Sequence, residues 1–480
     1  MADEQLYQVL QEKFGFTNFR PGQEKVIKAL LAGKDTLAVL PTGAGKSLLY
    51  QLPAYVLPGI TLIVSPLISL MQDQVERLRR RGERRVVMLN GQLTGYERAQ
   101  VLQHLTSYKF VFTSPETLAN SDVVTALQQV QLSLLVVDEA HCISQWGPDF
   151  RPEYLLLKKI RTTLAKPLTL LLTATATPTV RHDILEKLGL DESEIFQVVR
   201  SVNRPNILMA VTTLANQEEK DHQLLQLVQK FHGSGIIYFA SRKLATQMAN
   251  QLAKQTGKNV AAYHAGVSPV ERFRIQEQFM NNQLQIICAT SAFGMGIDKN
   301  DIRFVIHYHM PSNLENYVQE IGRAGRDGRQ SIAVLLYAPG DEQIQRQLTR
   351  LDLPPEELLS QVQNGELPAS VMGEQGEIFE FYLTHHYQPQ QVLEVFKRRQ
   401  QQLKEELRIM LDYVMQDSCR RSYILQYFGE TPIVVDQLCC DVDDPTWEEQ
   451  EILPASSPKD TSGYLTWQQR LARLIKIATS

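Results

Sequence analysis

The sequence predicts an α/β protein with two successive parallel-sheet domains and a mainly helical C-terminal region. Short apolar runs alternate with helical stretches in the first 200 residues, a second such series follows residue 206, and the alternation ends after Pro339. This alternation is typical of parallel sheets covered by helices on both faces. The length of 480 residues also exceeds what a single core usually organises.

The expected strands define the domain limits. We expect units at residues 1–208, 209–340 and 341–450, followed by a tail at 451–480. The first 35 residues are expected to be helical, long helices are expected over 390–427, and the last part of the tail has the periodicity of a basic amphipathic helix. The expected strands are 37–40, 61–64, 86–89, 110–113, 134–137 and 168–172 in the first unit, and 236–239, 260–263, 285–289, 304–307 and 332–337 in the second.

Composition limits the classes of partner. The net charge is −4, from 49 Lys and Arg against 53 Asp and Glu, so any nucleic-acid site must be a local basic channel. Five scattered cysteines argue against a disulfide framework and for a reducing compartment. The N-terminus lacks a signal-peptide core, and no apolar run is long enough to cross a membrane. We therefore expect a cytoplasmic protein, associated with the nucleoid if bacterial, and a monomer.

A phosphate-binding loop is predicted between the first strand and the helix that follows it. The segment after Leu40 reads Pro-Thr-Gly-Ala-Gly-Lys-Ser and then enters an apolar helical pattern. Glycines let the backbone N–H groups face inward, and the helix N-terminus favours a polyphosphate. Lys46 would reach the outer phosphates and Ser47 would ligate magnesium. Leu40 stands where the strict pattern has glycine. The predicted loop residues are Thr42, Gly43, Ala44, Gly45, Lys46 and Ser47.

An acidic pair follows the apolar run 134–137. Asp138 and Glu139 stand where a nucleotide site needs one carboxylate near magnesium and another to activate water. Taken alone, such a pair is more often a helix cap. Its position after the phosphate loop favours the catalytic interpretation.

Two arginines in the second unit are candidates for contact with phosphates. Arg323 and Arg326 are three residues apart in the stretch 319–329, so on a helix they would share one face. Arginine binds phosphate oxygens with a planar fork, and the small residues between these two allow close approach of another surface. If both reach the phosphates held by the first unit, the nucleotide lies between the domains.

These motifs resemble those of superfamily-two helicases, and specifically the RecQ family of DNA helicases. The resemblance spans about residues 5–340 and implies two RecA-like domains, ATP and Mg²⁺ as cofactors, and single-stranded and forked DNA as partners. The matching segments are FGFTNFRPGQ at 14–23, PTGAGKS at 41–47, SPLISL at 65–70, DEAH at 138–141, TAT at 173–175, YFASR at 238–242, YHAG at 263–266, TSAFGMGIDK at 290–299 and QEIGRAGRDG at 319–328.

The resemblance also assigns roles to single residues. Gln23 would bind the adenine edge, Arg20 and the aromatic Phe16 would enclose its ring, and Gln319 would join the two arginines at the phosphates. The stretch 141–154 is similar to the aromatic-rich loop of the family, which couples DNA binding to hydrolysis. Its candidate residues are His141, Trp146, Phe150 and Arg151; Pro148 departs from the histidine common in relatives. Rings and a guanidinium suit stacking on bases and contact with phosphate.

The C-terminal region departs from the family pattern. Relatives usually carry four zinc-binding cysteines after the helicase core. The segment after Cys419 resembles the one that bears the first, whereas only Cys439 and Cys440 stand where three more are spaced in relatives. Three thiols with Asp436 or Asp443 would form a tetrahedral set. Because adjacent cysteines rarely ligate one ion, the sequence favours a degenerate site and leaves zinc open.

The expected activity is ATP-dependent DNA unwinding in repair and recombination, with the 3′-to-5′ polarity that the resemblance implies. Relatives commonly continue into a winged-helix domain and often a further small helical (HRDC) domain, and the stretch after Gln450 is too short for a winged helix, so we expect a short form. Two alternatives stay open: a DNA-dependent translocase or remodelling ATPase that unwinds weakly, and an RNA helicase of the DEAH kind. Comparing ATP hydrolysis with strand release separates the first, and comparing stimulation by DNA and RNA separates the second.

Overall fold

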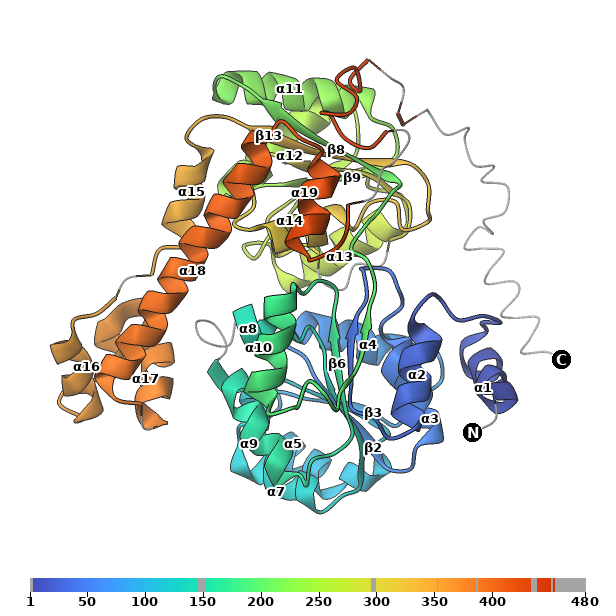
Figure 1. Ribbon diagram of the computed structural model, residues 1–480, viewed down its shortest axis with the longest axis vertical. Helices are drawn as coiled ribbons and strands as arrows, with labels where there is room; N and C mark the ends of the chain where they lie inside the picture. The colour runs from blue at the N-terminus through green and yellow to red at the C-terminus, as the bar shows by residue number, and fades with distance from the viewer. Residues whose placement is uncertain are drawn as a thin grey trace.

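The computed structural model describes residues 3–145, 152–294, 299–351, 353–385, 387–432, 438–449 and 452–453. Two sheet domains lie one above the other, and a helical region in orange and red runs beside both (Figure 1). Among the described residues, no helix combines the length and apolar character needed to cross a membrane.

The first domain is a seven-stranded parallel sheet in the order β3-β4-β2-β5-β6-β1-β7. Side chains of β1 and of the residue after it alternate between two cores: Leu37 and Val39 join one, and Ala38 and Leu40 join the other. Both faces are therefore covered, as the apolar runs predict. The strands are β1 Thr36–Val39, β2 Ile60–Val64, β3 Val86–Leu89, β4 Phe110–Thr113, β5 Leu132–Val137, β6 Thr169–Thr173 and β7 Phe196–Val199.

The helices of this domain follow the strands in the expected alternation. They are α1 Asp3–Phe14, α2 Gln23–Leu31, α3 Leu48–Val56, α4 Ile68–Arg80, α5 Gly95–Gln103, α6 Pro115–Leu118, α7 Ser121–Gln128, α8 Cys142–Gln145, α9 Leu157–Thr163 and α10 Pro178–Leu188, with the 3-10 turns η1 Leu105–Ser107 and η2 Pro152–Leu156.

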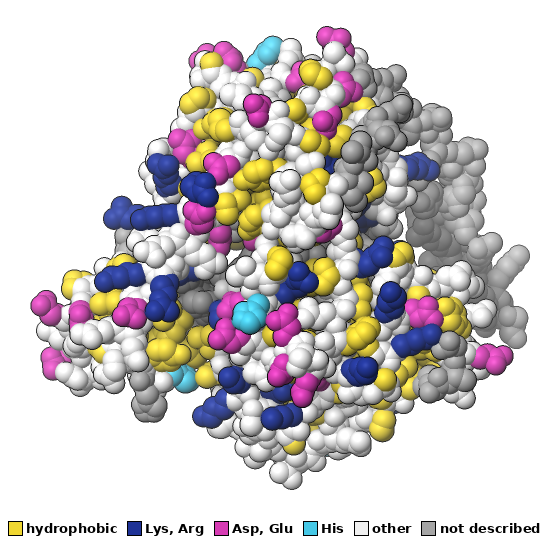
Figure 2. All heavy atoms as spheres, viewed as in Figure 1, with side chains coloured by type: hydrophobic (Ala, Val, Ile, Leu, Met, Phe, Trp, Pro, Cys, Tyr) yellow, Lys and Arg dark blue, Asp and Glu magenta, His cyan; other side chains and the backbone are white. Residues whose placement is uncertain are grey.

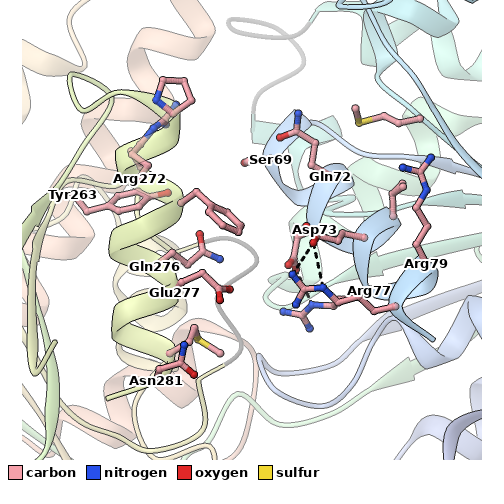
Figure 3. Close-up of a pocket in the computed structure, with 18 of the residues that line it drawn as sticks. Ser69, Gln72, Asp73, Arg77, Arg79, Tyr263, Arg272, Gln276, Glu277 and Asn281 are labelled. Atoms are coloured by element: carbon pink, nitrogen blue, oxygen red, sulfur yellow. Dashed lines mark hydrogen bonds and ion pairs between the residues drawn. The ribbon is translucent and has the colours of Figure 1, made fainter. Parts of the chain in front are cut away.

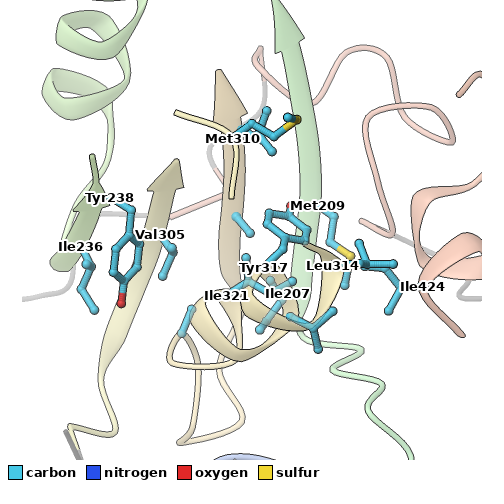
Figure 4. Close-up of a cluster of buried hydrophobic side chains, with 14 of the residues drawn as sticks. Ile207, Met209, Ile236, Tyr238, Val305, Met310, Leu314, Tyr317, Ile321 and Ile424 are labelled. Atoms are coloured by element: carbon cyan, nitrogen blue, oxygen red, sulfur yellow. The ribbon is translucent and has the colours of Figure 1, made fainter. Parts of the chain in front are cut away.

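The second domain is a six-stranded parallel sheet in the order β10-β11-β9-β12-β13-β8. Its strands are β8 Ile207–Thr213, β9 Ser234–Tyr238, β10 Val260–Tyr263, β11 Ile286–Ala289, β12 Ile302–His307 and β13 Ser331–Tyr337. Its helices are α11 Gln217–Lys230, α12 Arg242–Thr256, α13 Pro269–Met280 and α14 Leu314–Ile321. In Figure 4, α14 side chains such as Leu314, Tyr317 and Ile321 lie over this sheet, and Ile424 from the C-terminal region closes the cluster.

Every predicted strand is present, and two further strands were not predicted. β7 lies at the sheet edge with a partly exposed face, so it lacks a continuous apolar run. β8 comes directly after the interdomain linker, residues 203–206, whereas the first strand predicted in the second unit is 236–239.

The C-terminal region is helical as predicted. It contains α15 Asp341–Leu348, α16 Glu356–Gln363, η3 Ala369–Gln375, α17 Gly376–Thr384, α18 Pro389–Met415 and α19 Arg420–Tyr427. The 27-residue α18 carries a separate small core away from the second sheet, and Leu155 of the first domain packs against that core (Figure 1). The predicted tail helix lies outside the described residues.

Candidate nucleotide site between the sheet domains

The phosphate loop begins where β1 ends. Gly43 and Gly45 have φ values of 85° and 76°, in the left-handed region that favours glycine. The turn closes when the backbone N–H of Leu48 donates to Gly45 O at 3.1 Å and that of Leu49 donates to Lys46 O at 3.0 Å. Ser47 therefore immediately precedes α3, and the loop ends at a helix N-terminus whose N–H groups are suited to an anion.

Two of the residues assigned to adenine contact this loop. Gln23, which is buried, donates from Nε2 to Ala44 O at 2.8 Å and to Gly45 O at 3.1 Å, and the Arg20 guanidinium donates to Gly43 O. A Cβ at position 45 would stand 2.7 Å from Gln23 Nε2, so a larger residue there would displace the Gln23 amide in addition to straining the backbone at a φ of 76°. The start of α2 thus fixes the loop backbone. The third, Phe16, is 47% exposed.

The acidic pair lies at the end of β5, as predicted. Glu139 is buried and has a φ of 50°, which is unusual for a residue other than glycine and is found mainly at functional sites. Its backbone N–H donates to Asp138 Oδ1 at 3.0 Å. Burial and the Glu139 charge raise the pKa of Asp138 to about 7, while Lys46 acts in the opposite direction. The effect of Lys46 shows that the Asp138 carboxylate lies near the phosphate loop.

His141 connects the acidic pair to the strand next to it. Its Nδ1 lies 2.9 Å from Thr173 Oγ1 and 3.5 Å from Glu139 Oε2. Because the Thr173 hydroxyl donates to Thr175 O at 3.0 Å, it accepts from His141 Nδ1–H. Burial lowers the pKa of His141 and thereby favours the neutral imidazole, while the Glu139 charge acts in the opposite direction. Trp146, Phe150 and Arg151 of the predicted DNA loop lie outside the described residues.

The second domain meets the loop through the segment after α14. Thr42 Oγ1 donates to Gly322 O at 3.2 Å, and a Cβ at Gly43 would stand 3.2 Å from Arg326 Cδ. Gln319 lines the same crevice together with Thr42. The predicted juxtaposition of loop and arginine segment across the domain interface is therefore present.

The expectation that Arg323 and Arg326 share one helix face is wrong. Helix α14 ends at Ile321, and the glycine-rich segment that follows turns instead of continuing the helix. Arg326 lies against Gly43, whereas Arg323 is buried and donates to Gly294 O. The two side chains thus point to different places.

Arg323 is enclosed by residues of the second domain. A Cβ at Gly294 would stand 2.3 Å from Arg323 Nη2, so the guanidinium needs a glycine there. Beside it lies the Tyr238 hydroxyl, which donates to Phe293 O at 3.0 Å. The Nε atom of Arg323 has no hydrogen-bond partner among the described residues.

Sequence reasoning missed Arg204 as a site residue. Its guanidinium donates to the carbonyls of Gly322, Ala324 and Gly325, which flank the two arginines. The only signal was an arginine beside Pro205 in the linker.

A cleft of about 1170 Å³ separates α4 of the first domain from α13 of the second. Figure 3 shows Asp73 and Arg77 on α4 facing Gln276 and Glu277 on α13. Side chains of both signs line the cleft, including Asp73, Glu76, Arg77 and Arg79 on α4 and Arg272 and Glu277 on α13. The surface in Figure 2 also has basic and acidic side chains interspersed, in agreement with the small net charge.

Four metal-ligand side chains converge beside β8 of the second domain, where Cys439 and Cys440 meet Met209. The ligand atoms of Cys419, Cys439, Cys440 and Asp443 lie within 4.8 Å of one another. Cys419 Sγ and Cys439 Sγ are 3.6 Å apart, and Cys440 Sγ lies 3.0 Å from Asp443 Oδ2. Three sulfurs and one carboxylate suit tetrahedral zinc. The preference for a degenerate site is therefore not supported, because the turn at 439–443 brings both adjacent cysteines into the set; Asp436 lies outside the described residues.

Three family models match the chain. They are the DEAD/DEAH box helicase over residues 20–184, the helicase conserved C-terminal domain over 219–328, and the RecQ zinc-binding domain over 384–444. The chain is 41% identical to the probable ATP-dependent DNA helicase RecS of Bacillus subtilis (strain 168), over 99% of this chain and 98% of that protein. It is 37% identical to the ATP-dependent DNA helicase RecQ of the same organism, over 88% of this chain and 64% of that protein.

Solved structures share the fold at lower identity. The DUF1998 helicase MrfA bound to DNA has a TM-score of 0.60 at 18% identity, covering 80% of this chain and 61% of that one. The DEAD-box helicase Mss116 bound to single-stranded RNA has a TM-score of 0.57 at 18% identity, covering 85% and 90%. These similarities show the tandem RecA-like architecture.

Proposed function

The chain belongs to the RecQ family and is an ATP-dependent DNA helicase, and on that premise we propose that it moves 3′-to-5′ along single-stranded DNA and unwinds duplexes in repair and recombination. Residues 1–208 and 209–340 act as the two RecA-like domains, and residues 341–450 as the zinc-binding subdomain.

The contact between the two domains at the phosphate loop supports this proposal most directly. Thr42 reaches Gly322, and Arg326 lies against Gly43, so a phosphate held by the loop is within reach of both domains. Hydrolysis between them can open and close the gap, which is how a nucleotide cycle becomes movement on a strand.

The residues divide the chemistry between them. Lys46 would bind the outer phosphates, and Ser47 and Asp138 would hold Mg²⁺, which neutralises charge on the transferring phosphoryl group. Glu139 would accept the proton of the attacking water. On the arginine side, Arg326 and Gln319 lie at the loop and would stabilise the charge that develops at the γ-phosphate, and Arg323 would join them once its guanidinium leaves the Gly294 carbonyl.

Coupling to DNA is assigned to the stretch after the acidic pair. His141 contacts Glu139 and Thr173, so a displacement of the chain after His141 would also move the Glu139 carboxylate, which is assigned to activate water. Trp146, Phe150 and Arg151 would contact bases and phosphates.

We assign zinc to Cys419, Cys439, Cys440 and Asp443, where it would tie α19 to the turn that follows it. Metal analysis of the purified protein should find one equivalent of zinc, and Asp443→Ala should lose it more readily to a chelator. Purified protein that is folded and active but contains no zinc would refute the assignment.

The activity is tested with a panel of substrates: fork, 3′ tail, 5′ tail and blunt duplex. The wild type should release strands from the 3′ tail and fork, and Lys46→Ala should lose both hydrolysis and unwinding. DNA-stimulated hydrolysis in Lys46→Ala would refute the assigned site, and brisk hydrolysis without strand release would mark a translocase instead.

A further inference from the structure

The interdomain linker is attached to the arginine segment of the nucleotide site by one side chain. Arg204 donates from Nη1 to Gly322 O at 2.7 Å, and from Nη2 to Ala324 O and Gly325 O, both at 2.8 Å. Carbonyls just beyond a helix end lack intrahelical partners and carry partial negative charge, so a planar guanidinium satisfies several at once. The backbone that presents Arg323 and Arg326 is thus held by the linker.

The linker is held in turn by the zinc-binding subdomain. Arg421 of α19 is 1% exposed. It donates from Nη1 to Asn203 Oδ1 and to Arg204 O, both at 2.8 Å, and from Nη2 to Ile207 O at 2.6 Å. Its Nε lies 3.3 Å from Cys439 Sγ. One buried side chain therefore joins the cysteine cluster to the backbone on both sides of Arg204.

We propose that Arg421 and Arg204 are positioning residues for ATP hydrolysis, acting in series from the cysteine cluster through the linker to the segment that carries Arg323 and Arg326. This inference rests on the proposed role of those two arginines at the nucleotide. It makes the zinc-binding subdomain part of the machinery that sets the hydrolysis rate, in addition to any part in folding.

The neighbouring Arg420 provides a matched control. It is also buried, on the same helix and beside the same cluster, but within the described part of the chain its hydrogen bonds go to Asp441 and to the carbonyls of Tyr413 and Val414. A defect in folding alone should follow substitution of either arginine. A defect in positioning should follow only Arg421 and Arg204.

The experiment compares Arg204→Met, Arg421→Lys and Arg420→Lys in the full chain. Displacement of catalytic groups by about 1 Å can cost a hundredfold in rate, so we expect kcat at saturating single-stranded DNA to fall about 10- to 100-fold in the first two variants. The KM for ATP should stay close to wild type, because the phosphate loop is intact. Arg204→Lys keeps the charge and a single donor nitrogen, so its kcat should lie between those of Arg204→Met and the wild type.

A second readout does not depend on turnover. The wild type should bind ADP with aluminium fluoride more tightly than ADP alone, since this complex mimics the transferring phosphoryl group. Arg204→Met and Arg421→Lys should lose that preference at unchanged ADP affinity. Arg420→Lys should lower the melting temperature and keep both kcat and the preference.

Failure of the positioning role and failure of the proposed nucleotide site give different results. Wild-type kcat and preference in Arg204→Met, or equal losses in Arg421→Lys and Arg420→Lys, would overturn the positioning role. Wild-type kcat in Arg326→Ala would instead refute the proposed site itself, whatever the linker variants do.

Discussion

The two domains form the two walls of the nucleotide site. The first wall, from the first domain, consists of residues that are close together in the sequence, whereas the second wall, from the second domain, is held by residues far apart in the chain. Gly43 to Ser47 form one strand–loop–helix turn, and Asp138 and Glu139 end a single strand. The arginine segment is held by Arg204, which is 118 residues away from Gly322, and Arg204 is held by Arg421.

The two walls should therefore respond differently to substitutions. In the first wall, a substitution removes a chemical group from a backbone that its own strand and helix keep in place. In the second wall, a substitution outside the site can displace the arginines without removing them. The predictions below test that contrast, from the largest expected effect to the smallest.

Arg326→Ala should cause the largest loss on the second wall. An arginine at the transferring phosphoryl group is worth about 10³-fold or more in kcat, and ATP binding depends mainly on the loop. Steady-state hydrolysis with saturating DNA should therefore show a collapse in kcat at similar KM. Arg329→Ala, on the same segment but exposed, should behave as wild type; equal losses in both would contradict the assignment.

Glu139→Gln tests the first wall. Loss of a general base costs about 10²- to 10⁴-fold, and the amide keeps the shape of the side chain. The variant should bind ATP and single-stranded DNA normally in fluorescence titrations and hydrolyse slowly. The exposed Glu186→Gln serves as the control, and a variant that hydrolyses at the wild-type rate would remove Glu139 from the mechanism.

The affinity for magnesium nucleotide should depend on pH through Asp138. Its pKa is raised to about 7, chiefly by burial and then by Glu139. Proton and metal compete for this carboxylate, so affinity should fall by up to about tenfold per pH unit below 7. The same shift means that the folded protein binds more protons than the unfolded chain between pH 3.8 and about 7, so this group's contribution to stability declines as pH rises.

Calorimetric titrations at several pH values measure the effect, and Asp138→Asn provides the comparison. The variant should bind magnesium nucleotide weakly with a flatter pH profile. A profile as steep as that of the wild type would place the titrating group elsewhere.

Glu315→Gln should have the smallest effect, on stability alone. Glu315 lies on α14; it accepts the Tyr427 hydroxyl at 2.5 Å, and its Oε2 has no hydrogen-bond partner among the described residues. Burial raises its pKa from 4.5 to about 7, so the contribution of this group to stability falls as pH rises from 4.5 and is lowest above about 7. The amide should raise the melting temperature by roughly 2–4 °C near pH 8.5 and leave it almost unchanged near pH 4, below the unfolded pKa of 4.5.

The exposed Glu380→Gln is the matched control and should change neither value. Melting curves that shift equally at both pH values would show that Glu315 acts through shape instead of charge.

Sequence by itself determined the tandem parallel sheets, the phosphate loop at 41–47 and the acidic pair at 138–139. These features depend on backbone preferences and burial over a few residues, so apolar runs, glycines and charged residues after strands are sufficient to predict them. They are also the parts of the site whose predicted positions match the structure.

Tertiary structure alone decided where the arginines point and what holds them. The spacing of Arg323 and Arg326 predicts one helix face, but the chain leaves the helix at Ile321 because glycines follow and Arg204 binds the freed carbonyls. Likewise, the sequence leaves Asp436 and Asp443 as alternatives for the fourth member of the cysteine cluster, and only folding places the Asp443 carboxylate within 4.8 Å of the three sulfurs. Such contacts depend on how distant segments pack, and no local pattern in the sequence records that packing.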